Sequence, residues 1–200
     1  MKITRFVPIL LLASTIASAS PRGTDPKPEP KVEESKENLD ALEHGIELFR
    51  MKKYVEAEKA FEALRKAKVQ TSTWGKASNN LGITLRVQKK YAEAVAVFES
   101  ILTSNVDDRD PGGSLMESFR NYRYNACLEI ARCHVYTKDY KAALKYLTLA
   151  KNKYTFEADC GTCATQAAEN LREHEEWVRA KIAETSATPG APEAPAQPVK

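Results

Sequence analysis

The sequence predicts an all-helical protein, and three observations support this prediction. Between residues 36 and 184, apolar side chains recur at helical spacing, and no alternating apolar and polar run is long enough for a strand. A short pattern occurs three times: a tyrosine, an alanine three residues later and a large apolar residue four residues further on. The copies begin at Tyr54, Tyr91 and Tyr140, at unequal intervals. A fixed spacing inside the copies and a variable spacing between them indicate repeated modules with insertions at the joints.

Seven helices are predicted in order along the chain. They span residues 36–51, 54–68, 73–88, 91–104, 115–137, 140–153 and 162–184. Ser35 is a suitable N-cap for the first helix, and Leu42, Ile46 and Phe49 follow at helical spacing. Two-residue joints at 52–53, 89–90 and 138–139 mark tight turns. The first six helices are therefore expected to form three pairs.

The seventh predicted helix differs from the others because charged residues cover one of its sides. Stacked repeats need an end piece with a polar outer face, since the last apolar face would otherwise stay in contact with water. Residues 162–184 are therefore expected to cap the array. Residues 105–113, rich in aspartate and ending in Pro-Gly-Gly, are expected to form a solvated loop between the second and third pairs. The apolar side of the capping helix consists of Ala164, Ala167, Ala168, Leu171, Val178 and Ile182.

The repeated pattern extends upstream of each tyrosine. Gly45, Gly82 and Ala131 each lie 12 residues before the alanine of their own copy. This resembles the tetratricopeptide repeat, a 34-residue helix–turn–helix unit with small residues where its two helices cross. The resemblance covers units at about 38–71, 75–108 and 124–157, although none has the early tryptophan or the closing proline of the family. It implies three helix pairs stacked as a short superhelix, followed by the capping helix.

Both ends of the chain differ in composition from this helical part. Lys2 and Arg5 precede an apolar run and the sequence Ala17-Ser18-Ala19, so residues 1–19 are expected to be a secretory signal peptide. Residues 20–35 and 185–200 are rich in proline, and we expect a disordered linker and a disordered tail there. The chain is thus expected to be exported, with the periplasm favoured over the extracellular space.

Charge and motifs exclude several classes of function. The formal net charge is +3, and Lys2 and Arg5 contribute two of these charges, so nucleic acid is not expected as a partner of the mature chain. No segment after residue 19 approaches transmembrane length, so no membrane span is expected there. The sequence contains no phosphate-binding P-loop and no G-x-S-x-G, and His174-Glu175 starts a zinc motif that lacks its second histidine. We therefore expect no enzyme activity, no metal and no cofactor.

The four cysteines, Cys127, Cys133, Cys160 and Cys163, are candidates for structural disulfides in an oxidising compartment. Cys127 and Cys133 lie six residues apart on one predicted helix, which separates them by about 9 Å along the axis and places them beyond disulfide reach. Two arrangements stay open. Either Cys160–Cys163 closes alone and two thiols are buried, or two bonds join the third pair to the capping helix, with Cys133 to Cys160 or Cys163 as a candidate.

Two other uses of the cysteines are possible in principle. Cys160-Gly161-Thr162-Cys163 is a C-x-x-C motif near the predicted start of a helix, where thiol pKa values fall and thiolates become reactive. Four cysteines can also bind zinc tetrahedrally. Structural bonds are the favoured interpretation, and thiol redox chemistry is the main alternative.

The family resemblance also implies a binding surface. In tetratricopeptide arrays the first helix of each unit lines a concave groove, and asparagine side chains there can donate to and accept from a peptide backbone. Glu129 stands where a carboxylate-clamp arginine would be, so such a clamp is not expected. The groove residues implied by the alignment are Lys76, Asn79, Asn80, Arg86, Asn125 and Arg132.

The expected function follows from the resemblance and the predicted export. It is a protein–protein interaction module, a scaffold or assembly factor of the cell envelope, that binds a peptide segment in its groove. A thiol oxidoreductase or redox-responsive protein that uses the Cys160–Cys163 motif is the alternative. A structural homo-oligomer is a third possibility.

Overall fold

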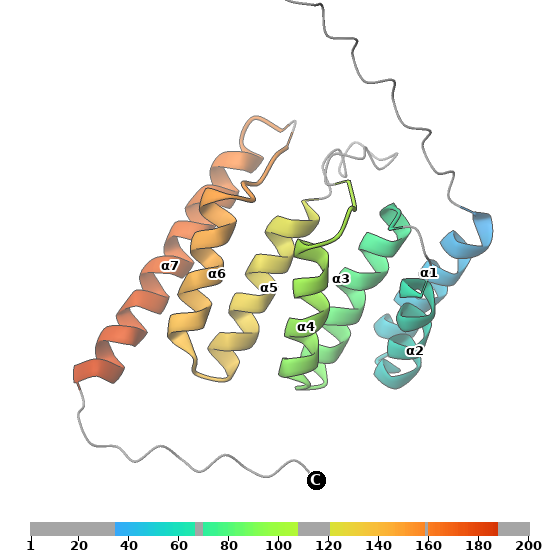
Figure 1. Ribbon diagram of the computed structural model, residues 1–200, viewed down its shortest axis with the longest axis horizontal. Coiled ribbons are helices and arrows are strands. Elements are labelled where there is room, and N and C mark those ends of the chain that lie inside the picture. The colour runs from blue at the N-terminus through green and yellow to red at the C-terminus, as the bar shows by residue number, and fades with distance from the viewer. Residues whose placement is uncertain (1–34, 67–69, 108–120, 159, 188–200) are drawn as a thin grey trace, which may run out of the picture. The chain divides into compact units, whose positions relative to one another are not determined.

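A computed structural model describes residues 35–66, 70–107, 121–158 and 160–187, and over these ranges the chain consists of helices without a strand (Figure 1). The predicted all-helical class is confirmed for this part of the chain. The predicted signal peptide and nearly all of the linker, the tail from residue 188, and residues 108–113 of the predicted loop lie outside the described ranges. The helices are α1 (Lys36–Arg50), α2 (Tyr54–Arg65), α3 (Ser72–Val87), α4 (Tyr91–Leu102), α5 (Tyr122–Tyr136), α6 (Tyr140–Asn152) and α7 (Cys163–Ala187).

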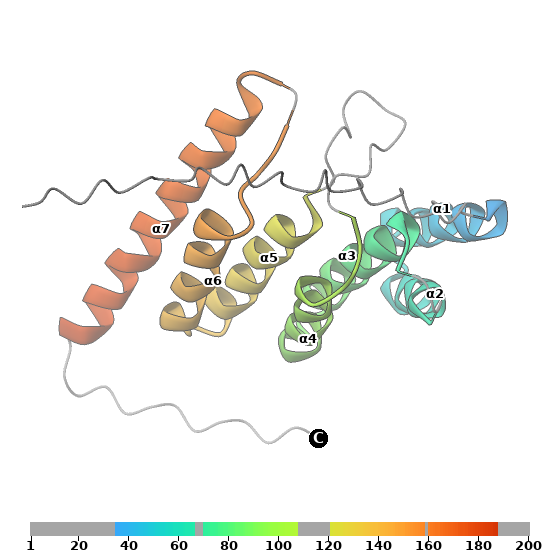
Figure 2. The same ribbon diagram turned by 45° about the horizontal axis from the view of Figure 1, so that its top comes forward.

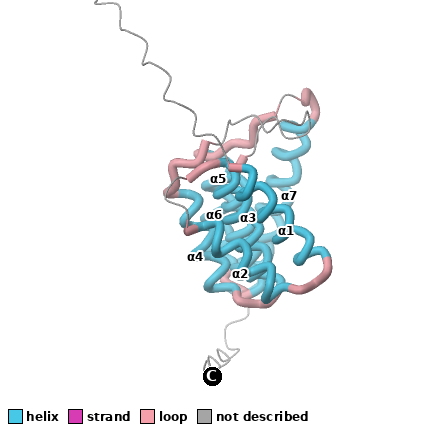
Figure 3. The backbone as a smooth tube through the Cα atoms, turned by 90° about the vertical axis from the view of Figure 1, so that its right-hand side faces the viewer, coloured by secondary structure: helices cyan, strands magenta, loops and turns pink. Residues whose placement is uncertain are grey.

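Each helix packs against the next one in the chain, and α3 also contacts both α1 and α5. In Figure 2, α1, α3 and α5 form one row, while α2, α4 and α6 form a second row beside it. Figure 3 shows that the described loops join the helices at their ends. The seventh helix, α7, packs against α6, but it does not approach α5 as closely as α1 and α5 approach α3.

The three turns inside the pairs have the same backbone conformation. Lys52, Lys89 and Lys138 adopt left-handed φ values of 61°, 65° and 63°. The residue after each lysine donates its N–H back to the last turn of the helix, as Lys90 does to Leu85 O at 2.9 Å. Left-handed residues of this kind end helices and satisfy their last carbonyl groups. The predicted tight turns are therefore present, and they reverse the chain within two or three residues.

In each of the first two helix pairs, a contact between a glycine and an aromatic ring holds the two helices of that pair together. A Cβ atom on Gly82 would lie 2.4 Å from the ring of Phe98, and one on Gly45 would lie 2.7 Å from the ring of Phe61. Both phenylalanines are completely buried. In the third pair, Ala131 occupies the position of the glycine and Leu147 occupies the position of the phenylalanine. The first residue is therefore larger than in the other pairs, and its partner is smaller. Core packing tolerates such exchanges when the total volume is kept.

Arg65 joins the first pair to the second. Its Nε donates to Ser78 Oγ at 3.0 Å, and its terminal nitrogen donates to Ser100 Oγ at 2.8 Å. Trp74 Nε1 in turn donates to the Arg65 carbonyl oxygen at 3.2 Å. Ser78 is fully buried, and its hydroxyl group accepts the hydrogen bond from Arg65 Nε.

Most predicted helix ends lie within one to three residues of the observed ends, and the start of the fifth helix differs most. The fifth helix was predicted to run unbroken from residue 115, but Asn121 has a left-handed φ of 47° and α5 begins at Tyr122. Residues 115–120 of this prediction lie outside the described ranges. The Asn121 side chain exchanges two hydrogen bonds with the backbone of Glu157, at 2.8 and 2.9 Å. The last helix extends to Ala187, so residues 185–187 are not part of a disordered tail. The hydroxyls of Thr185 and Ser186 donate to carbonyl groups of the preceding turn of α7.

The glycine–ring contact can be tested with a double-mutant cycle. Gly82→Ala is expected to destabilise the fold by roughly 1–3 kcal/mol, because the added methyl group overpacks the contact. The higher helix propensity of alanine offsets about 1 kcal/mol of this loss. Adding Phe98→Leu reproduces the combination found in the third pair, so the double variant should be more stable than the sum of the single losses implies. Denaturant unfolding gives the three free energies. A coupling energy of zero would show that the contact does not govern the pair, and Gly161→Ala, at an open position, is the control.

Glu58 predicts a specific pH dependence of stability. Lys90 Nζ contacts both of its carboxylate oxygens at 2.9 Å, and Gln88 Nε2 donates to it at 2.6 Å. Burial acts to raise the pKa of Glu58, but the hydrogen bonds from Lys90 and Gln88 prevail and lower this pKa from its ordinary 4.5. The stability contribution is therefore fully present above pH 4.5 and is lost as the pH falls through the lower folded-state pKa.

Glu58→Gln should remove this pH dependence and lower stability by about 0.2–1 kcal/mol at neutral pH, as expected for a largely surface pair. Thermal unfolding between pH 3 and 7 measures the effect. Glu56→Gln, at an exposed position of the same helix, is the matched control. Parallel pH profiles for wild type and Glu58→Gln would contradict the assignment.

Candidate functional site

The six residues of the predicted groove lie on two helices that contact each other. Lys76, Asn79, Asn80 and Arg86 belong to α3, whereas Asn125 and Arg132 belong to α5. All are half-buried except Arg132, which is exposed. The six predicted groove residues therefore lie on neighbouring helices. Whether their side chains are available to a ligand depends on the hydrogen bonds that they make within the protein.

The asparagines on α3 are partly used by the helix itself. Asn80 Nδ2 donates to the Lys76 carbonyl oxygen at 2.9 Å, a bond within one turn. The Asn79 Oδ1 atom is buried and accepts no hydrogen bond from the described residues. A buried amide oxygen without a donor is unusual, because such a group costs about 1–3 kcal/mol. The side-chain amides of Asn79 and Asn80 are thus less accessible to a bound peptide than the family resemblance implies.

Glu129 brings the two arginines of the predicted groove together. This carboxylate is 6% exposed, and it lies between Arg86 Nε, at 2.7 Å, and the Arg132 guanidinium. The bond from Arg86 links α3 to α5 directly. A buried carboxylate needs such partners because removing its charge from water is costly. Arg86 and Arg132, two residues of the predicted groove, are therefore also ion-pair partners of Glu129.

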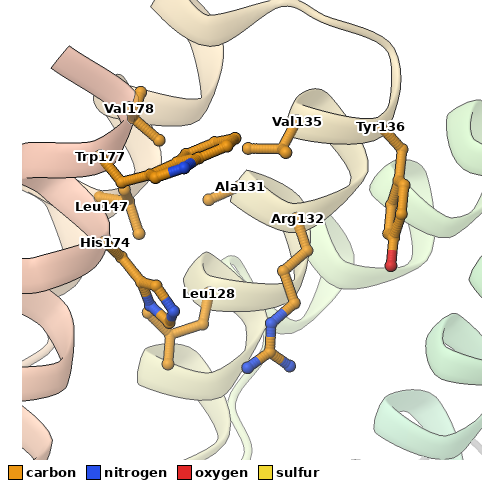
Figure 4. A pocket seen from close by; sticks show the side chains of 9 residues that line it. All are labelled: Leu128, Ala131, Arg132, Val135, Tyr136, Leu147, His174, Trp177 and Val178. Carbon is orange, nitrogen blue, oxygen red and sulfur yellow. The ribbon is translucent and has the colours of Figure 1, made fainter. Parts of the chain in front are cut away.

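A second feature of this face is a cavity of about 270 Å³ between α5, α6 and α7 (Figure 4). Figure 4 shows Trp177 and His174 projecting from α7 toward the side chains of α5. The walls are mainly apolar, with Arg132 at one edge. The lining residues are Leu128, Ala131, Arg132, Val135, Tyr136, Leu147, His174, Trp177 and Val178.

The cavity exists because α7 is held on α6 and stands away from α5. Leu171 and Val178 of α7 are buried, and so is Glu175, which is 5% exposed. Glu175 accepts a hydrogen bond from Lys151 Nζ of α6 at 2.9 Å. Because α7 does not approach α5 as closely as the helices of the α1, α3, α5 row approach one another, the apolar residues at the end of that row border an open space.

Two large side chains at the cavity are exposed. Trp177 is 47% exposed and Tyr136 is 58% exposed. Tyr136 stacks on Tyr91 of α4, with ring centroids 5.3 Å apart, and Trp177 contacts the Tyr140 ring edge-on at 6.1 Å. Neighbouring rings therefore hold both side chains while leaving apolar surface in water. Exposed apolar surface that lines a cavity is typical of binding sites.

Sequence reasoning missed this cavity, although a signal for it was present. Trp177 lies inside the incomplete zinc motif that begins at His174. The capping helix was expected to turn a polar face outward, yet a tryptophan lies one residue from buried Val178 and is itself half exposed. An aromatic residue at the edge of the apolar side of a terminal helix was the available indication.

The cysteines adopt the first of the two arrangements left open above. Cys160 and Cys163 form a disulfide with a Cα–Cα distance of 5.2 Å, while Cys127 and Cys133 are free and buried in α5. Burial raises the pKa of Cys127 to about 12 and that of Cys133 to about 11, so both are uncharged thiols at neutral pH. The candidate bond from Cys133 to Cys160 or Cys163 is not formed.

A four-cysteine zinc site is not assembled either. The sulfurs of Cys160 and Cys163 are joined to each other, and zinc requires free thiolates. Within the described ranges, no group of three or more histidine, cysteine, aspartate or glutamate side chains is arranged to hold a metal ion.

Comparisons with known proteins identify no relative of this chain. No protein-family model matches the sequence, and no curated protein or solved structure is significantly similar to it. Among the described helices, none combines the length and the apolar character needed to cross a membrane.

The Glu129 network predicts unequal effects of removing its two arginines. Arg86→Ala is expected to destabilise the fold by about 1–3 kcal/mol, since it leaves a buried acceptor with fewer partners. Arg132→Ala should have a smaller effect, because the Arg132 side chain is 49% exposed, against 18% for Arg86. Denaturant unfolding measures both, with exposed Arg179→Ala as the control. Adding Glu129→Gln to Arg86→Ala should recover part of the loss, and equal losses for the two arginines would contradict this assignment.

Proposed function

We propose that this chain is an exported interaction protein of the tetratricopeptide type, which binds a segment of another protein on the α1, α3, α5 face and in the α5–α7 cavity. The observation that carries the proposal is the cavity itself, which is apolar, open at one side and bordered by the exposed Trp177. The repeated glycine–ring contacts at Gly45 and Gly82 support the family assignment, because they occur where that family has its small residues.

The size and lining of the cavity favour a single side chain as its occupant. Sites for drug-sized molecules span about 300–1,000 Å³ and carry several polar groups. The present cavity measures about 270 Å³ and is mainly apolar. A leucine, methionine or aromatic side chain of an extended segment suits such a space. Burying one of these contributes about 1.5–3 kcal/mol, so useful affinity requires further contacts along the face.

Arg132 supplies a polar contact next to the cavity. One of its nitrogens is engaged by Glu129, but a guanidinium carries five N–H donors, and half of the side chain is exposed. The remaining donors can bond to backbone carbonyl groups of a bound segment. The Glu129 carboxylate already partners Arg86 and Arg132, so the face selects an apolar side chain and a backbone rather than a terminal carboxylate.

The cellular role belongs to the same proposal. A charged start, an apolar run and the Ala17-Ser18-Ala19 sequence support export, with the periplasm as the destination. The Cys160–Cys163 disulfide agrees with an oxidising compartment. In that setting the chain serves as a scaffold or assembly factor of the cell envelope.

The binding proposal can be tested with peptides selected from a random display library on the mature protein, residues 20–200. We expect the selected peptides to share a large apolar residue. Trp177→Ala should weaken their binding about tenfold, the equivalent of 1.4 kcal/mol. Val55→Ala removes an apolar side chain that is 56% exposed on α2, away from the cavity, and is the matched control.

Fluorescence gives an independent readout of the same binding. The chain has two tryptophans, and Trp74 is buried, so Trp74→Phe leaves Trp177 as the reporter at the cavity. Peptide binding should shift its emission to shorter wavelength as water is excluded. Peptides that bind wild type and Trp177→Ala equally would overturn the proposal. So would a dimer that forms through Trp177, because the face would then bind a second copy.

A further inference from the structure

The Cys160–Cys163 disulfide lies at the exposed start of α7, outside the site described above. Both cysteines are exposed, as are Gly161 and Thr162 between them. A Cβ atom built on Gly161 would meet no atom within 4 Å. Thiol–disulfide exchange requires that an incoming thiolate reach a sulfur atom along an open path. The surroundings of this bond provide that access.

The bond does little to hold the fold together. It closes a segment that a turn already fixes, since Cys163 N donates to the Cys160 carbonyl oxygen at 3.2 Å. The attachment of α7 to α6 depends instead on Leu171, Val178 and the Glu175–Lys151 pair. A disulfide stabilises less when the loop that it closes is shorter. Reduction therefore leaves the packing of α7 in place.

The position of Cys160 favours a thiolate once the bond opens. Cys163 is the first residue of the 25-residue helix α7, and its N–H points at Cys160 Sγ at 3.2 Å. Thr162 Oγ1 lies 3.5 Å from the same sulfur. Donors and the positive end of a helix dipole lower the pKa of a thiol. A dithiol whose reduced form is stabilised in this way acts as an oxidant when it is in the disulfide form.

An apolar cavity of about 150 Å³ begins beside the bond. Ala164, which directly follows Cys163, lines it together with Ala168 and Leu171 of the same helix. Tyr124 and Phe156 form part of the opposite wall, with ring centroids 5.3 Å apart. This surface can hold an apolar residue next to a cysteine of a protein substrate, so a binding surface and an accessible disulfide lie side by side.

We propose that Cys160 and Cys163 form an exchange-active disulfide that oxidises thiols, with Cys160 as the residue that forms the mixed disulfide. A substrate thiolate attacks Cys160 Sγ, the Cys160–Cys163 bond breaks, and its electron pair leaves on the Cys163 sulfur, which takes a proton. A second substrate thiolate then attacks the substrate sulfur of the mixed disulfide and releases Cys160 as a stabilised thiolate. The substrate dithiol loses two electrons and two protons. The chain takes up both electrons and one proton, on Cys163, while the other proton passes to water and Cys160 stays a thiolate.

The other two cysteines do not interfere with this reaction. Cys127 and Cys133 are fully buried, and burial raises the pKa of each thiol. Neutral buried thiols neither attack the exposed bond nor form mixed disulfides. The reactive pair is thus isolated from the free thiols of the same chain.

The test uses residues 20–200 with Cys163→Ser and, separately, Cys160→Ser. A peptide whose single cysteine carries a 2-nitro-5-thiobenzoate group as an activated disulfide should be trapped by the Cys160 thiolate of the Cys163→Ser protein at least about tenfold faster than by Cys163 of the other variant. The peptide becomes the mixed disulfide, and nitrothiobenzoate leaves as the thiolate. Mass mapping identifies the cysteine. The alkylation rate of Cys160 in Cys163→Ser should have a pH midpoint below the ordinary thiol value of about 8.5. Val55→Ala, which changes an exposed side chain of α2, should leave both results unchanged.

Two arms identify the source of the thiol. Wild type is mixed with a reduced two-cysteine peptide or with reduced glutathione. The formation of oxidised peptide or oxidised glutathione, and the matching reduction of the Cys160–Cys163 bond, are followed over time by mass after alkylation. Faster oxidation of the peptide indicates a protein substrate, and faster oxidation of glutathione indicates a small thiol; both support exchange. Equal trapping by the two variants, or a midpoint at or above 8.5, would overturn the proposal. A large fall in melting temperature on reduction of wild type would also overturn it, since the bond would then be structural.

Discussion

The close approach of a glycine to a buried ring is the contact on which the rest of this structure depends. Gly82 and Phe98 leave no space for even one added carbon atom, and Gly45 and Phe61 repeat the arrangement one pair earlier. The contact sets how near the two helices of a pair can lie, and the left-handed lysine turns set how sharply the chain reverses between them. Once each pair has this geometry, α1, α3 and α5 come to lie beside one another, and their outward residues form one face.

The end of the row is where this regularity stops. Lys151 and Glu175 hold α7 on α6, while α5 has no equally close neighbour on that side. The helix therefore covers the apolar core at Leu171 and Val178 but leaves a cavity bordered by Trp177. A terminal helix of this kind protects the core and also leaves space for an apolar side chain of a partner. The polar residues on α3 and α5 offer no comparable apolar space.

The polar residues of the face serve the fold more than a ligand. Glu129 is buried between two guanidiniums, and Arg65 joins two serines on neighbouring helices. The cysteines divide in a similar way: Cys127 and Cys133 fill the core as neutral thiols, while Cys160 and Cys163 carry the only disulfide within the described residues. Residue types that suggest chemistry in a sequence thus separate by burial into structural groups and accessible ones.

The sequence by itself determined the helices, the turns between them and the small residues at the crossings, because these depend on local spacing and on contacts within one helix pair. It also excluded a bond between Cys127 and Cys133 by helix geometry. Only the tertiary structure decided that Arg86 and Arg132 share a buried carboxylate, that the disulfide is local, and that α7 leaves a cavity beside α5. The physical reason is that these outcomes depend on how far separate helices stand from one another. That distance is set by the side chains of several helices packing together, and no single helix pattern contains it.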